Sequence, residues 1–121
     1  MGKQVKPKEL YSQRTIEKFT DYVNGDSGGL NYLIENQHRD LMAMLDAIRG
    51  DDEAFRLLMN SKRFILAAFV NAIWEDKQAF QLLLKFAPEW AAMVNIIEGD
   101  EKAIKFLLMN KKEHYVNLAL S

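Results

Sequence analysis

The chain has 121 residues and no cysteine, which predicts a single domain and excludes disulfides and thiolate metal sites. Its 16 basic and 17 acidic residues give a formal charge of −1, so no excess of charge points to nucleic acid or to a membrane surface. Hydrophobic residues make up 49% of the chain, enough for a folded core, but no apolar run is long enough to span a bilayer.

The chain begins with a basic stretch, residues 1–8, which we expect to be a flexible arm ahead of a single α-helical repeat domain over residues 9–121. No apolar segment of the kind found in a secretory signal follows this stretch, so a soluble, cytoplasmic protein is expected. Residues 9–23 are predicted to form a longer first helix that caps the N-terminal end of the domain.

From residue 16 onwards the sequence repeats with a period of about 25 residues. Each repeat has an aspartate after a short turn and an apolar pair six or seven residues later. Agreement over several columns is typical of proteins built from stacked units. The units span residues 16–40, 41–65, 66–89 and 90–114, and their turn aspartates are Asp26, Asp51, Asp76 and Asp100.

Each unit is predicted to be a helix-turn-helix pair, as the second unit shows most clearly. Its first helix, helix A, has an apolar stripe at helical spacing. Gly50 then stands where a helix end needs positive φ, and Asp51 is placed to cap a second helix, helix B, by accepting hydrogen bonds from its first backbone N–H groups. The stripe of helix A consists of Leu41, Met44, Leu45 and Ile48.

Helix B carries more apolar residues than one partner helix can cover, including Leu57, Leu58 and Met59 in the second unit. We therefore expect neighbouring units to cover them, which is the packing of a solenoid. Residues 113–120 resemble a fifth helix A and are expected to cap the C-terminal end. The predicted fold is all-α: four stacked helix-turn-helix repeats of about 25 residues, an α-solenoid, with capping helices at both ends.

Three departures from the repeat carry structural predictions. Glu75 replaces the turn glycine, so either a non-glycine residue takes a left-handed conformation there or that turn differs. Gly28 and Gly29 replace helix-forming residues and should weaken helix B of the first unit by about 1 kcal/mol each. Pro88 fits the first turn of the helix that opens the fourth unit.

Residues 47–58, with the sequence Ala-Ile-Arg-Gly-Asp-Asp-Glu-Ala-Phe-Arg-Leu-Leu, resemble the helix-turn-helix core of an ankyrin repeat, and residues 72–83 and 96–107 do so more loosely. The units are shorter than the about 33 residues of that family by a length that corresponds to its β-hairpin, and its Thr-Pro-Leu-His opening is absent. The chain is thus similar to an ankyrin-like short helical repeat that lacks the β-hairpin. This resemblance implies binding of another protein across a face lined by the A helices.

Two columns of the repeat are candidates for such a face. Trp74 occupies a column that holds Arg49 and Glu98 in neighbouring units, so its indole should be partly exposed as an interface anchor, unless it packs on a neighbouring unit. An Asx column opposite the core stripe of helix A, which begins with Asp21, forms either a polar row suited to a polar or basic partner or a solvent-facing column. The predicted partner-binding residues are Trp74, Asp46, Asn71, Asn95, Arg49 and Glu98.

Residues 25–29, Gly-Asp-Ser-Gly-Gly, match the sequence around the nucleophile of chymotrypsin-like serine proteases. In that family the catalytic His and Asp precede the serine in the chain, whereas both histidines of this chain follow Ser27, so a protease is not expected. These glycines also lack the Lys-Ser/Thr of a phosphate-binding loop. His38 and His114 fall in polar connections between units and are expected to be solvated, with no further ligands to complete a metal site. We therefore predict no catalytic residue, no metal and no cofactor, and we place Trp90 in the core.

These observations favour a non-enzymatic protein–protein interaction module, an adaptor or an inhibitor or immunity-type binder, with a rigid helical-repeat surface. One alternative is an enzyme or small-ligand-binding protein with a pocket between repeats. Another is a nucleic-acid-binding protein that uses the basic arm, although the exposed helix B columns mix both signs of charge. The basic arm carries Lys3, Lys6 and Lys8, and Arg14 follows it. The expected partner is another protein; no membrane contact is expected, and nucleic acid is a less favoured partner.

Overall fold

The computed structural model describes residues 9–121, and within that range it contains nine α-helices and no strand, which confirms the all-α class. The predicted basic arm, residues 1–8, lies outside the described residues. The helices are α1 (Gln13–Val23), α2 (Ser27–Glu35), α3 (Arg39–Ile48), α4 (Asp52–Asn60), α5 (Phe64–Ile73), α6 (Lys77–Phe86), α7 (Pro88–Ile97), α8 (Glu101–Met109) and α9 (Glu113–Ala119).

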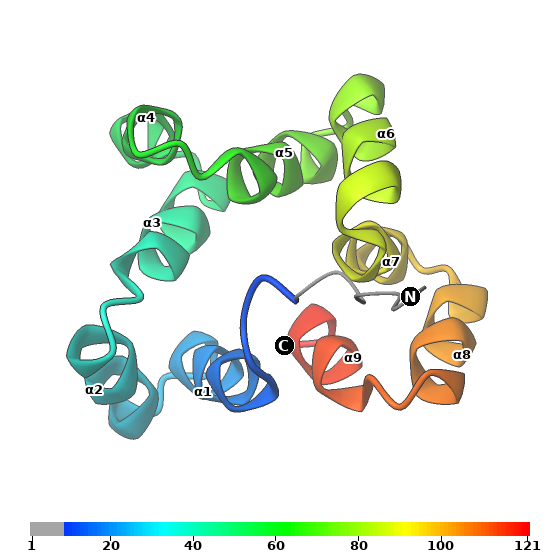
Figure 1. The fold of residues 1–121 in the computed structure, drawn as a ribbon, viewed down its shortest axis with the longest axis horizontal. Helices are drawn as coiled ribbons and strands as arrows, with labels where there is room; N and C mark the ends of the chain where they lie inside the picture. The colour runs from blue at the N-terminus through cyan, green and yellow to red at the C-terminus, as the bar shows by residue number, and fades with distance from the viewer. Residues whose placement is uncertain (1–8) are drawn as a thin grey trace, which may run out of the picture.

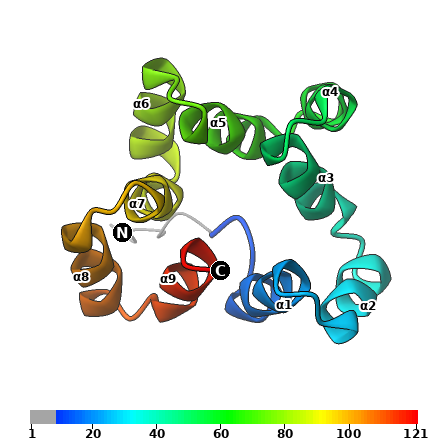
Figure 2. The same cartoon turned by 180° about the vertical axis from the view of Figure 1, so that it is seen from behind.

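The helices are arranged in a ring (Figures 1 and 2). The predicted A helices, α1, α3, α5, α7 and α9, surround its centre, and we call them the inner helices; the B helices, α2, α4, α6 and α8, stand at its corners and are the outer helices. Inner helices pack on one another from α3 to α9, and α9 packs on α1. The sequence predicts these two end helices as caps at opposite ends of a stack, but in the ring they are neighbours, because the units turn round a common centre.

The core fills the centre of the ring in layers, because equivalent positions of the inner helices face one another. Trp90 is 1% exposed, which confirms its predicted place in the core. Its ring centroid lies 5.1 Å from that of Phe69 and 6.3 Å from that of Tyr115. One buried layer consists of Ile16, Leu41, Leu66, Trp90 and Tyr115, and the next consists of Phe19, Met44, Phe69, Met93 and Leu118.

The outer helices are less covered than the sequence predicts. Each packs against the inner helices before and after it, but none packs closely against another outer helix in the described chain. Leu58 is fully buried, whereas its neighbours Leu57 and Met59 are 53% and 43% exposed. The prediction that neighbouring units cover both flanks of helix B is therefore wrong, because the ring holds the outer helices apart at its corners.

The turns between inner and outer helices follow the predicted pattern. Gly50 has a φ of 105°, and the N–H of Asp51 donates to the carbonyl of Asp46 at 3.0 Å, which closes the end of α3. The carboxylate of Asp51 accepts a hydrogen bond from the N–H of Glu53 at 3.0 Å and so caps the start of α4. The same positive φ recurs at Gly25 and Gly99.

Glu75 keeps this turn without glycine, since its φ is 73° and its N–H donates to the carbonyl of Ala72 at 3.0 Å. A side chain in the left-handed region costs about 1 kcal/mol, so we expect Glu75→Gly to raise the free energy of unfolding by about that amount. Urea unfolding followed by circular dichroism measures this difference. The reverse change at the equivalent turn, Gly50→Glu, is the control and should lower stability; a Glu75→Gly variant that is no more stable than the wild type would refute the assignment.

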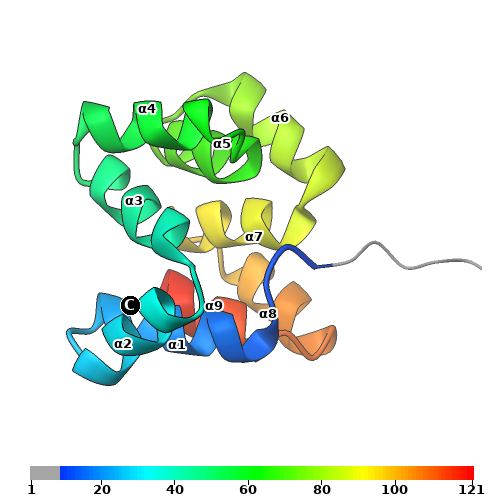
Figure 3. The same ribbon diagram turned by 60° about the vertical axis from the view of Figure 1, so that its left-hand side comes forward.

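The end of the ring at which outer helices return to inner ones is closed by the segment before α1. This helix begins at Gln13, with Ser12 as its N-cap, so the predicted helix over residues 9–23 starts later than expected. Tyr11 is buried, with its ring centroid 6.2 Å from that of Trp90, and its hydroxyl donates to the carboxylate of Asp40. Figure 3 shows this segment beside α7.

Lys112 holds the same end of the ring together. Its ammonium pairs with the carboxylate of Glu9 and, at 3.1 Å, with that of Glu89. Partial burial acts to lower the pKa of Lys112, but the hydrogen bonds to the two carboxylates outweigh it and raise that pKa. The charged side chain therefore joins the N-terminal segment, α7 and the connection before α9.

Candidate functional site

The opposite end of the ring, where inner helices turn into outer helices, is what we call the open end. It comprises residues 24–28, 49–53, 74–78 and 98–102, together with the C-terminal turns of the inner helices. These four segments carry nine acidic and three basic residues, a formal charge of −6, whereas the chain as a whole carries −1. The near-neutral total therefore conceals a strongly acidic surface at one end.

Trp74 stands at the open end as the C-cap of α5, and its side chain is 65% exposed. The predicted exposure is thus confirmed. Its indole Nε1 donates to the carbonyl of Ile48, at 3.3 Å, in the last turn of α3. The indole therefore rests on the neighbouring unit and remains accessible, which holds it in one orientation before any partner arrives.

A groove of about 360 Å³ lies beside this indole, between the second unit and α5. Phe55 and Asn71 line it together with Trp74, and Asp51 and Asp52 add negative charge to it. Asn71 is half-buried, whereas Asp46 in the same column of the repeat is exposed, so the two interpretations of the Asx column both stay open.

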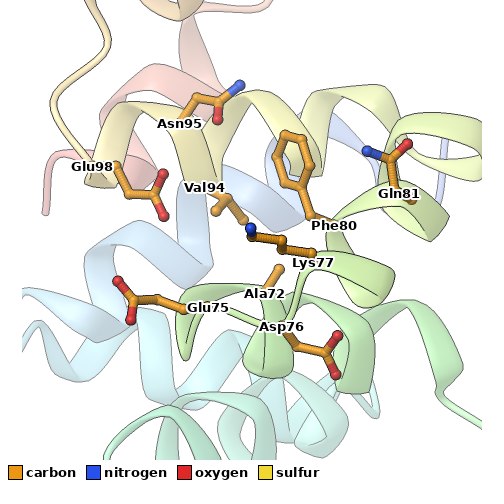
Figure 4. A pocket seen from close by; sticks show the side chains of 9 residues that line it. All are labelled: Ala72, Glu75, Asp76, Lys77, Phe80, Gln81, Val94, Asn95 and Glu98. Atoms are coloured by element: carbon orange, nitrogen blue, oxygen red, sulfur yellow. The ribbon is translucent and has the colours of Figure 1, made fainter.

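An equivalent groove of about 550 Å³ lies one unit further on, between α6 and α7 (Figure 4). Phe80 stands where Phe55 stands in the first groove, Asn95 corresponds to Asn71, and Glu98 takes the place of Trp74. In the view of Figure 4, Glu98 lies on one side of the groove, Phe80 and Gln81 lie on the other, and Lys77 lies between. The repeat thus produces two similar grooves with different chemistry at three positions, because Glu75, Lys77 and Glu98 stand where the first groove has Gly50, Asp52 and Trp74.

The six predicted partner-binding residues share one end of the ring but do not form one site. The first groove contains Asn71 and Trp74, and the second contains Asn95 and Glu98. Asp46 is exposed and lines a third depression, of about 390 Å³, beside α4. Arg49 is exposed but lines none of these three.

An apolar pocket of about 370 Å³ opens at the centre of the open end, and residues of all five inner helices line it. Its floor is the second layer of the core, whose members include Met93 and Leu118. Its wall is the following helical turn of the inner helices, where Ile97 is 48% exposed. The wall residues, which the sequence places in the core stripe, are Val23, Ile48, Ile73 and Ile97. Sequence reasoning missed this pocket because it exists only when the ring closes.

His114 differs from its prediction, because it is 6% exposed in the first turn of α9 and not solvated. Closure of the ring places α9 between α7 and α1, which buries the imidazole. Its Nε2 atom has no hydrogen-bond partner among the described residues, and burial lowers its pKa.

This burial predicts a pH dependence of stability. The pKa of His114 in the folded state lies below the value of about 6.5 for an unfolded chain, so the folded state binds fewer protons. Its contribution is therefore unchanged above about pH 6.5 and becomes unfavourable as the pH falls towards the folded pKa. We expect the free energy of unfolding to drop more between about pH 7.5 and 5.5 in the wild type than in His114→Phe. The His38→Gln variant is the control, and equal drops in the wild type and His114→Phe would exclude this role.

Among residues 9–121, no group of three or more His, Asp or Glu side chains is arranged to hold a metal ion. In the same part of the chain, no helix has the length and apolar character needed to cross a membrane. No protein-family model, curated protein or solved structure matches the chain. The ankyrin-like resemblance therefore stays a prediction.

Proposed function

We propose that the chain is a non-enzymatic module of ankyrin-like helical repeats that binds another protein at the open end of its ring. The observation that carries this proposal is Trp74, a large aromatic side chain that is 65% exposed yet anchored by its hydrogen bond to Ile48. Exposed aromatic side chains with a fixed orientation are typical anchors of protein interfaces.

The surroundings of Trp74 support the same proposal. The groove beside it offers the amide of Asn71 and the ring of Phe55, a combination of polar and apolar contacts that suits a protein surface. The helices that carry these residues pack on a shared core, so little conformational entropy is lost when a partner binds. An adaptor, or an inhibitor that blocks a single target, would use such a surface.

Affinity capture from the native cell tests this proposal with three forms of the chain. We expect the wild type and Met109→Ala to recover the same partner and Trp74→Ala to recover at least about tenfold less, since anchor residues contribute about 2 kcal/mol or more. Met109 is a matched control, because its side chain is 82% exposed on α8 but lies at the end of that helix away from the open end. Equal recovery by all three forms would refute the role of Trp74.

A further inference from the structure

The central pocket of the open end combines an apolar interior with an acidic surrounding. The side chains of its floor belong to the buried core, since Met93 and Phe69 are at most 4% exposed. At its rim, the side chain of Ile97 is exposed to solvent. At about 370 Å³, its volume falls within the range of natural binding pockets. An apolar group that enters it would be surrounded by residues of the five inner helices and so be shielded from water.

The electrostatic character of the pocket mouth follows from the direction of the helices. The five inner helices all contribute residues from their C-terminal halves, so their last carbonyl groups, which carry partial negative charge, gather round the mouth. The four turns that surround it add a formal charge of −6. Both features favour a group that brings positive charge next to an apolar one.

We infer that this pocket receives one apolar side chain from a segment of the partner protein that is rich in lysine and arginine. The inference rests on the proposed function, which it extends by naming the chemistry of the bound segment. The apolar side chain fills the space above Met93 and Leu118, and the flanking basic side chains face the acidic turns.

One position offers a way to fill the pocket. Ala119 lines it on α9 with a small side chain, whereas the equivalent position of α3 lines it with the larger Leu45. A larger side chain at Ala119 would therefore project into the pocket. The variant Ala119→Phe blocks the pocket in this way, and Ala119→Ser is its matched control because it stays small.

Selection from a random dodecapeptide display library, with the full chain as target, tests the inference without a known partner. We expect the enriched peptides to carry two or more Lys or Arg residues next to a large apolar residue. A synthetic, fluorescein-labelled peptide from this set should bind Ala119→Phe at least about tenfold more weakly than the wild type and bind Ala119→Ser equally well, as measured by fluorescence anisotropy. Binding should weaken as salt rises from 50 to 300 mM, because the charges at the rim are exposed.

The second variant, Arg49→Gln, keeps the test independent of any folding defect in Ala119→Phe. It removes one of the three basic residues of the open end and should tighten binding of the same peptide by about two- to threefold. Enriched peptides that are neutral or acidic, or the absence of any enriched peptide, would overturn the inference. Basic peptides that lose affinity with Trp74→Ala but not with Ala119→Phe would overturn it as well, while the proposed function at Trp74 would stand.

Discussion

Trp90→Ala is expected to lower the free energy of unfolding by about 3–5 kcal/mol, because it empties the centre of the core. Trp90 is 1% exposed, and its ring packs near those of Phe69, Tyr115 and Tyr11. Truncation leaves a cavity where α5, α7, α9 and the N-terminal segment meet, and close packing on all these sides limits how far the core can collapse to fill it.

Urea unfolding followed by circular dichroism measures this loss, and Trp74→Ala is the control with the same chemical change. Trp74 is 65% exposed and makes one hydrogen bond, so its truncation should cost less than about 1.5 kcal/mol. Since domains of this size are stable by only about 5–15 kcal/mol, Trp90→Ala should be close to the limit of folding. Equal losses in the two variants would show that Trp90 is not at the centre of a shared core.

Gly29→Ala is expected to lower stability by about 1–3 kcal/mol, although alanine favours a helix more than glycine does. The reason is the close approach of α2 to α1. A Cβ atom at Gly29 would lie 2.5 Å from the backbone nitrogen of Tyr22 and 2.6 Å from the carbonyl oxygen of Lys18, and these backbone atoms cannot move without separating the helices.

Gly28→Ala is the matched control for this prediction. Its Cβ would meet only the side chain of Asp26, at 3.1 Å, and the equivalent Glu53 has a side chain while its N–H donates to the carboxylate of Asp51 in the same cap. Gly28→Ala should therefore raise the free energy of unfolding by up to about 1 kcal/mol, as helix propensity predicts. If thermal or urea unfolding shows that both alanine variants are more stable than the wild type, the close contact of α1 and α2 is not real.

The sequence was sufficient for the local structure of this protein, because that structure depends on neighbours in the chain. The period of the apolar stripe predicts the inner helices, and Gly50 followed by Asp51 predicts a helix end and the cap of the next helix; both are found. The exposure of Trp74 also followed from its column in the repeat. These features recur in each unit, so four occurrences of the pattern supported the same prediction of helix ends and caps.

The errors have one common origin, which is that the sequence does not show how much each unit turns relative to the last. That rotation closes the ring, and closure buries His114 while it leaves Leu57 and Met59 exposed. The close contact at Gly29 also depends on the distance between two helices, and the equivalent Ala54 gave no sign of it. The central pocket is the clearest case, because residues from all five inner helices line it.

Hydrogen–deuterium exchange of the chain, alone and bound to its captured partner, tests most directly whether the open end is the recognition surface. Protection on binding should be confined to the C-terminal turns of the inner helices and the turns and first helical turns that follow them, at residues 19–23, 45–55, 69–81, 93–100 and 118–121, because the grooves and the central pocket lie there. Protection that falls instead on the exposed apolar flanks of the outer helices, such as residues 57–59 and 82–84, would contradict the proposal and move the interface to the corners of the ring.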